Sequence, residues 1–418
     1  MSEDCLVLNV WTYDLAASRL PVLVYFHGGG HSMGSGSWPV YDGAAMARRG
    51  AVVVTVNHRL GILGYLPLAE LLGDEFRSSG ANGILDLVAA LMWVQENIES
   101  FGGDPGNVTM FGESGGGSKV AALLATPAAN GLYSRAAIMS GWFRMRCLPT
   151  SEASSLTHAT LTQLGLERSG MRELLDIDAD RLVVVGATLD GGGSGFAPVV
   201  DGDFVTTQPL EAVRSGAAPR VPLLIGTTRD EYSMFLRFAI AGSEGPAEDA
   251  ALAYLRATFG HHVDQVIETY QRLQPQLSAY EVYEAVATDG NVRFPSVCMA
   301  DAALTAGRDV YMYRFDWETP LDPSLKAAHG LDVPFVFDTT EAAAAVGGAP
   351  ECKQLADDMC GAWVAFAESG RPAVASGAAW PTYSIERRTT MLFDRSPRSE
   401  GDPGGGERAA WSRYSSMR

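Results

Sequence analysis

Residues 111–117 read FGESGGG and follow the apolar run Val108–Met110. The pattern G-x-S-x-G, formed by Gly112, Ser114 and Gly116, suits a sharp turn between a strand and a helix, because small neighbours permit strained backbone angles and leave the serine hydroxyl accessible. Glycine-rich turns that contain a serine are common in α/β chains, so this motif alone is weak. It makes Ser114 a candidate nucleophile and indicates an α/β fold.

A second glycine-rich segment lies upstream, where residues 22–30 read VLVYFHGGG. The apolar run is typical of a buried strand. The three glycines that follow His27 would let bare backbone N–H groups approach a developing oxyanion without obstruction by side chains. The two segments therefore indicate the two halves of one site.

A serine nucleophile in this context needs an acid and then a histidine further along the chain. Residues 221–235 read VPLLIGTTRDEYSMF, a strand-like run followed by Asp230 and Glu231, and the residues alone leave these two acids about equal. Residues 327–337 read AAHGLDVPFVF and offer His329 in a predicted loop. Asp332 and Asp316 are weaker alternatives for the acid.

Apolar periodicity along the chain agrees with this fold class. Residues 51–60 (AVVVTVNHRL) and 108–114 (VTMFGES) are short runs rich in β-branched residues, whereas residues 84–98 carry apolar side chains at helical spacing. Strands that alternate with helices favour a mainly parallel sheet with helices on both faces. The 418 residues, of which 47% are hydrophobic, are enough for a large core.

These segments resemble the type-B carboxylesterases, a family of the α/β-hydrolase superfamily, and are most similar in appearance to the bacterial p-nitrobenzyl esterases. Further segments resemble the family in the same order along the chain: SEDCLVLNVW (2–11), NHRLGILGYL (57–66), FGGDPGNVTMFGESGG (101–116), FAPVVDG (196–202) and WPTY (380–383). The resemblance implies an α/β-hydrolase fold with a helical cap or lid. It also implies a serine carboxylesterase that hydrolyses esters through an acyl-enzyme intermediate, without a cofactor or a metal.

The resemblance also implies roles for individual residues. Ser114 matches the family nucleophile, His329 the general base, and Glu231, the glutamate of the Asp-Glu pair, the acid that orients the base. The oxyanion donors are matched by Gly29, Gly30 and Gly115. Glu113 matches a glutamate beside the nucleophile, and its alternative interpretation is a buried carboxylate held by local hydrogen bonds.

The sequence gives fewer indications of substrate preference than of catalytic chemistry. Aromatic residues that could line the pocket include Trp38, Trp142 and Phe235, although aromatic side chains also dominate ordinary cores. His31 directly follows the triple glycine and replaces an aromatic residue of many relatives, so we expect it to face the acyl pocket.

The resemblance predicts one catalytic domain over residues 1–400, with helical cap or lid insertions at about 150–190 and 240–290. Residues 401–418 include GDPGGGE and are expected to form a flexible tail. Family members carry a segment upstream of SEDCL, so we expect their first edge strands and one wall of the site to be missing here.

Composition excludes several function classes. A net charge of −18 argues against nucleic acid as a partner, because such binding depends on Lys and Arg. The five cysteines form no C-x-x-C pair and no zinc-ligand spacing. No apolar run is long enough to span a membrane and no secretory segment is evident, so the expected location is the cytoplasm.

A small-molecule ester is thus the expected partner, and the oligomeric state is left open. Two alternatives remain for the function. An amidase or carbamate hydrolase could use the same triad, and a non-catalytic binding protein could retain the scaffold, although such relatives typically lack the serine.

Overall fold

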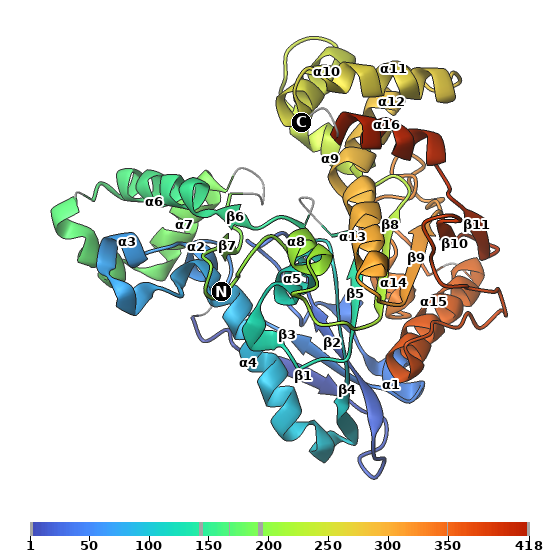
Figure 1. Cartoon of the computed structure of the whole chain (residues 1–418), viewed down its shortest axis with the longest axis horizontal. Helices are drawn as coiled ribbons and strands as arrows, with labels where there is room; N and C mark the ends of the chain where they lie inside the picture. The colour runs from blue at the N-terminus through green and yellow to red at the C-terminus, as the bar shows by residue number, and fades with distance from the viewer. Residues whose placement is uncertain (1–2, 142–144, 167, 191–194, 349, 416–418) are drawn as a thin grey trace.

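The computed structural model describes residues 3–141, 145–166, 168–190, 195–348 and 350–415. Its centre is a nine-stranded sheet in the order β1-β3-β2-β4-β5-β8-β9-β10-β11 (Figure 1). The strands are β1 (Leu8–Trp11), β2 (Leu20–Phe26), β3 (Val52–Val56), β4 (Gly103–Glu113), β5 (Arg135–Met139), β8 (Leu223–Thr228), β9 (Val310–Phe315), β10 (Thr389–Phe393) and β11 (Arg398–Gly401). Neighbouring strands from β3 to β10 run parallel, and β1 and β11 pair antiparallel at the two edges.

Alternating side chains of the central strands enter two different cores. On β2, Val22, Val24 and Phe26 belong to one buried cluster, whereas Leu23 and Tyr25 belong to the other. Successive side chains of a strand point to opposite faces, so a continuous apolar run is what a strand covered on both sides requires. The predicted mainly parallel sheet is confirmed.

Helices cover both faces of the sheet. Helices α4 (Asn82–Asn97), α5 (Gly115–Leu124), α8 (Pro209–Arg214) and α13 (Phe294–Thr305) contribute to the core around Val22, and α1 (Ala44–Arg48), α14 (Val333–Val336) and α15 (Pro350–Ser369) to the core around Leu23. This three-layer arrangement brings the carboxyl ends of the parallel strands to one edge, where such sheets place their ligand sites.

Two further groups of helices lie beyond these layers and are well separated in the view of Figure 1. The first group comprises α2 (Gly61–Tyr65), α3 (Ala69–Leu72), α6 (Thr150–Leu164) and α7 (Ala179–Leu189), with the two-stranded sheet of β6 (Leu148–Pro149) and β7 (Val199–Val200). The second group comprises α9 (Tyr232–Ile240), α10 (Ala247–Phe259), α11 (Val263–Leu273), α12 (Ala279–Thr288) and α16 (Gly405–Ser415). Helices thus form at both predicted insertions, and the domain boundaries themselves remain a prediction.

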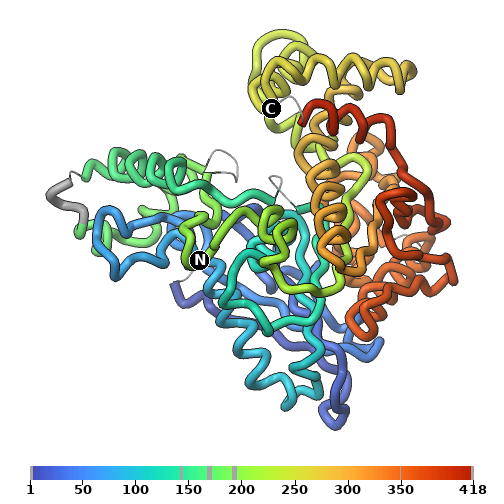
Figure 2. Tube along the Cα trace, viewed as in Figure 1, coloured from blue at the N-terminus to red at the C-terminus, as the bar shows by residue number. Residues whose placement is uncertain are grey.

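The flexible tail predicted for residues 401–418 is wrong for residues 405–415. These residues form helix α16, which packs beside α11 (Figure 2). Trp411 is buried, and its Nε1 donates a hydrogen bond of 3.1 Å to the hydroxyl of Tyr270. The glycine-rich stretch leads into the helix, and the apolar face of Ala410, Trp411 and Tyr414 supplies the burial that fixes it.

In the part of the chain that the structure describes, no helix is both long and apolar enough to cross a membrane.

Candidate active site

Ser114 lies on a strained turn between β4 and α5. Its backbone has φ of 57° and ψ of −121°, a region that non-glycine residues rarely occupy. The turn is held by the amide of Ser114, which donates to the carbonyl of Met139 at 2.9 Å. It is also tight, because a Cβ atom on Gly116 would lie 1.9 Å from the carbonyl oxygen of Phe26. The G-x-S-x-G pattern is therefore explained by close backbone packing.

The glycine loop after β2 lies directly against this turn. Gly29 and Gly30 have φ of 86° and 61°, and a Cβ atom on Gly115 would lie 2.0 Å from the carbonyl oxygen of Gly30. A Cβ atom on Gly28 would lie 3.3 Å from the Cβ of Ser114. Two segments more than 80 residues apart in sequence thus meet backbone to backbone around the serine.

Glu231, rather than Asp230, is the acid that meets the histidine. His329 Nδ1 donates to Glu231 Oε2 at 2.5 Å, and Glu231 is fully buried. The other oxygen, Oε1, accepts hydrogen bonds of 2.7 Å from the amide of Thr228 and from Ser140 Oγ. These three donors fix the carboxylate and, through it, the imidazole ring.

The competing acids all have other partners. Asp230 accepts from Arg229 Nε at 3.0 Å and from the amide of Ala327 at 3.1 Å. Asp332 accepts from the hydroxyl of Tyr313 at 2.8 Å, and Asp316 accepts two hydrogen bonds from the Arg314 side chain. A parallel bridge between Asp230 and Ala328 joins the loop of the acids to the loop of the histidine.

Glu113 approaches the opposite side of the histidine. Its Oε1 lies 3.1 Å from His329 Nε2, and both side chains are almost completely buried. Burial raises the pKa of Glu113 well above its usual range, although the charge of His329 opposes the shift. Burial lowers the pKa of His329, but the carboxylates of Glu113 and Glu231 outweigh that effect and raise it. Glu113 therefore favours the protonated form of the imidazole, and His329 in turn favours the ionised form of Glu113.

Ser114, Glu113 and His329 line one cavity of about 370 Å³. The other residues that line it are Gly28, Gly29, Gly30, Met33, Trp38, Val40, Tyr41, Phe235, Gly330 and Val333. Phe235 also packs edge-on against the imidazole of His329, with 5.1 Å between ring centroids. The cavity is large enough for a small ligand, and its walls are mostly apolar.

The other predicted pocket residues are placed differently. His31 is not among the residues that line the cavity, because it is buried with its ring edge-on to Tyr65 at 5.3 Å between centroids. Trp142 lies outside the described residues. Sequence reasoning missed Ser140, which follows β5 with φ of 47°, and Met33. A serine at the carboxyl end of the strand next to β4 was the available signal for Ser140.

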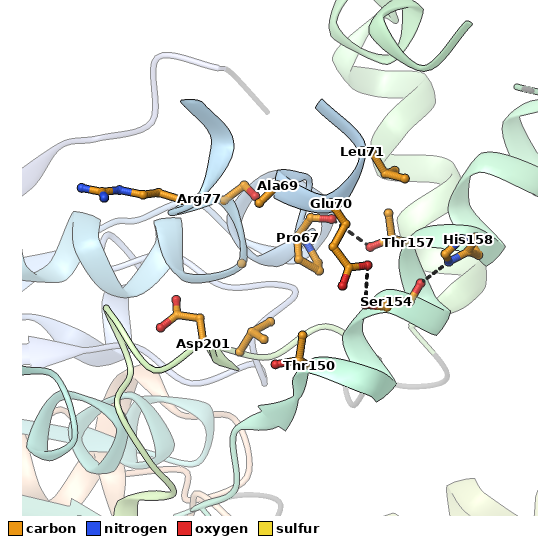
Figure 3. Close-up of a pocket in the computed structure, with 13 residues that line it drawn as sticks. Pro67, Ala69, Glu70, Leu71, Arg77, Thr150, Ser154, Thr157, His158 and Asp201 are labelled. Atoms are coloured by element: carbon orange, nitrogen blue, oxygen red, sulfur yellow. Dashed lines mark hydrogen bonds between the residues drawn. The ribbon is translucent and has the colours of Figure 1, made fainter. Parts of the chain in front are cut away.

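A second cavity of about 120 Å³ lies between α3, α6 and β7 (Figure 3). It contains a serine and a histidine, but Ser154 Oγ donates to Glu70 at 3.0 Å, and His158 Nδ1 contacts the backbone carbonyl of Ser154 at 2.8 Å. The hydroxyl and the imidazole are therefore not paired as nucleophile and base. Across the described residues, no group of three or more His, Cys, Asp or Glu side chains is arranged to hold a metal ion.

A parallel sheet with a serine on a strained turn, an acid-histidine pair and a glycine loop at one edge defines a serine hydrolase of the α/β-hydrolase class. The model of the carboxylesterase family matches residues 1–409, and the chain belongs to this family. It is accordingly a serine carboxylesterase, a carboxylic ester hydrolase.

Individual proteins to which the chain is similar are esterases as well. The chain is 39% identical over 413 residues to the para-nitrobenzyl esterase of Bacillus subtilis, covering 96% of this chain and 81% of the relative. It is 34% identical to the fumonisin B1 esterase of Sphingopyxis macrogoltabida, covering 94% and 72%. Among solved structures, a carboxylesterase of Geobacillus stearothermophilus is similar with a TM-score of 0.90 and 39% identity, over 98% of this chain and 86% of that one.

Proposed function

We propose that Ser114 is the nucleophile, His329 the general base and Glu231 the carboxylate that orients it, with oxyanion donors at Gly29, Gly30 and Gly115. The observation that carries this proposal is the contact of 2.5 Å between His329 and Glu231, made by a histidine that shares one cavity with Ser114. A carboxylate bound to Nδ1 keeps the proton on that nitrogen, so that Nε2 can accept the proton of the serine.

In the first half-reaction, Ser114 Oγ attacks the carbonyl carbon of the ester while its proton passes to His329 Nε2. The carbonyl oxygen becomes an oxyanion, which the three glycine amides stabilise. The bond to the alcohol oxygen then breaks, and His329 returns the proton to the leaving alcohol. Water repeats these steps on the acyl-enzyme, which releases the carboxylic acid and restores Ser114.

Glu113 is proposed to act through His329. A carboxylate 3.1 Å from Nε2 favours the protonated imidazole, the state formed in each tetrahedral intermediate. The same contact holds the ring in the substrate-free site. Glu113 would therefore tune the pH at which His329 becomes available as a base.

The cavity supports small, mostly apolar esters as substrates. Met33, Trp38 and Phe235 provide apolar wall next to Ser114, and the described residues that line the cavity include no Lys or Arg. We therefore expect neutral acyl groups to bind better than anionic ones. We propose an ester, rather than an amide or a carbamate, as the substrate. The cytoplasmic location of the enzyme remains a prediction.

The test is turnover of p-nitrophenyl acetate, butyrate and octanoate by the full chain and by Ser114→Ala, with Ser154→Ala as the matched control. Ser154 undergoes the same chemical change in the cavity of Figure 3. We expect Ser114→Ala to lose turnover by at least about 10³-fold and Ser154→Ala to stay within twofold of the original chain. Equal losses in both variants, or retained turnover in Ser114→Ala, would exclude Ser114 as the nucleophile. Faster turnover of p-nitroacetanilide than of p-nitrophenyl acetate would favour an amidase.

A further inference from the structure

Lys119 is a completely buried lysine only five residues after Ser114. It lies on α5, has 0% exposure, and its Nζ donates to the carbonyl oxygen of His27 at 2.9 Å. Lysine is almost never fully buried unless it is paired, because desolvation of an ammonium group is costly. The position of this amine therefore needs a reason beyond packing.

Three buried histidines lie close enough to Lys119 for its charge to act on their pKa values, and we call Lys119, His27, His31 and His58 the buried basic cluster. The exposed fractions of these histidines are 1%, 4% and 2%. The rings of His27 and His58 lie 4.7 Å apart, and within the described chain both ring nitrogens of His58 and Nε2 of His31 have no hydrogen-bond partner. None of these rings supplies a negative charge that would hold an ammonium group in place.

Two members of the cluster, His27 and His31, flank residues 28–30, which we call the oxyanion loop. His27 immediately precedes Gly28, and its Nδ1 contacts the Gly28 carbonyl at 2.8 Å. At the other end, the carbonyl of His31 accepts from the amide of Gly61 at 2.7 Å. The bond from Lys119 to His27 therefore ties the start of the loop to the same helix that begins after Ser114.

The charge state of the cluster is set by its surroundings. Burial lowers the pKa of Lys119 to about 7, and the carboxylate of Glu113 opposes this shift. Burial and the charge of Lys119 together lower the pKa values of His27, His31 and His58, so these rings are neutral near neutral pH. Among these groups, Lys119 is the one whose charge changes in the working range of an esterase.

We propose that Lys119 is a positioning residue of the oxyanion hole. Its bond to the His27 carbonyl holds the loop of Gly29 and Gly30 against the nucleophile turn, and its protonated form brings a positive charge behind these donors. A charge at that place favours an oxyanion more than a neutral carbonyl, so it acts on the transition state. This inference rests on the proposed roles of Ser114, Gly29 and Gly30.

The experiment compares the full chain with Lys119→Met, which keeps the length of the side chain but removes the donor and the charge. Leu123→Met, one turn later on the same buried helix, is the control for repacking. We expect kcat for p-nitrophenyl butyrate to fall about tenfold in Lys119→Met with KM within threefold, less than for loss of a whole oxyanion donor. Leu123→Met should stay within twofold.

Two readouts separate positioning from a merely structural role. The affinity of a trifluoromethyl ketone, which forms an oxyanion on the nucleophile, should fall by the same factor as kcat/KM. The ratio of kcat/KM between the original chain and Lys119→Met should be larger at pH 6 than at pH 8.5, because the ammonium form is populated below a pKa of about 7. Lys119→Gln, which retains an N–H donor, serves as the second variant if Lys119→Met does not fold, and it should also lose the pH dependence.

Labelling with a fluorophosphonate, followed by identification of the modified peptide, separates a failure of the role of Lys119 from a failure of the proposed function. Label on Ser114 in all variants together with unchanged kcat and ketone affinity in Lys119→Met would overturn the role of Lys119 and leave the proposed function intact. Absence of label on Ser114 in the original chain would overturn the proposed function and the role of Lys119 together. Label on Ser114 with the matched losses supports both.

Discussion

Replacement of Glu231 by glutamine tests the pairing of acid and base most directly. The carboxylate accepts from His329 Nδ1, from the amide of Thr228 and from Ser140 Oγ. An amide group has one oxygen, and this oxygen will accept the hydrogen bond from the backbone N–H of Thr228, which can only donate. The amide NH₂ then faces His329 Nδ1, which must give up its proton, so the proton moves to Nε2 and blocks the nitrogen that activates Ser114.

The magnitude follows from this tautomer change. The corresponding acid-to-amide change in a serine protease triad costs about 10⁴-fold in kcat, which is about 5.4 kcal/mol of barrier at 1.36 kcal/mol per factor of ten. Asp230→Asn is the matched control, since Asp230 is the adjacent acid and contacts Arg229 and the amide of Ala327 instead. We expect less than a threefold change in kcat, because these partners are outside the proposed triad, and at most about 1 kcal/mol of lost stability from the partly exposed ion pair.

The assay is kcat and kcat/KM for p-nitrophenyl butyrate at pH 8, with thermal melting of both variants to establish that they are folded. A larger loss of kcat in Asp230→Asn than in Glu231→Gln would refute the identification of the acid. Glu231→Gln activity above about a tenth of the original would refute the tautomer argument, because it leaves too little of the 10⁴-fold effect.

Three further outcomes are expected. The buried histidines His27, His31 and His58 have lowered pKa values, so below about pH 6.5 the unfolded chain binds protons that the folded chain does not. The free energy of unfolding should therefore decrease as the pH is lowered, by about 1.4 kcal/mol per pH unit for each histidine. His58→Phe should make this slope shallower in urea titrations between pH 5 and 7.5, and an unchanged slope would contradict the role of the buried histidines. Glu113→Gln removes a carboxylate that raises the pKa of His329, so the acidic limb of the kcat/KM profile should move about one unit lower; a limb that stays in place means that Glu113 does not act on His329. Trp411→Ala should lower the free energy of unfolding by about 3–5 kcal/mol in urea denaturation, whereas a loss below about 1 kcal/mol would mean that α16 adds little.

The fold could be predicted well because its signals are local. The apolar run of β2 and the turn at Ser114 each depend on a few consecutive residues whose backbone requirements are visible in their glycines and β-branched side chains. The order of serine, acid and histidine then follows from the carboxyl ends of β4, β8 and β9, which meet at one edge of the sheet.

The remaining details depend on side-chain direction and on tertiary burial. Asp230 and Glu231 are adjacent and chemically equivalent, and only the course of the loop after β8 decides which one turns toward His329. His31 was expected in the acyl pocket, but the positive φ values of Gly29 and Gly30 turn the chain so that its ring packs on Tyr65. Helix α16 was not predicted, because the glycine-rich stretch gives no indication that the Trp411 side chain is buried and anchors a helix.

The backbone contact between Gly30 and Gly115 has a consequence for engineering. Since a Cβ atom on Gly115 would lie 2.0 Å from the Gly30 carbonyl, no side chain lies between loop and turn that could adjust to a change in either. The wall of the cavity is different, because Met33 and Trp38 are 61% and 45% exposed and are not part of the contact between Gly30 and Gly115. Libraries that diversify Met33, Trp38 and Phe235 should therefore alter the range of accepted acids and alcohols, whereas the two glycine segments should be inherited or transplanted only as a unit.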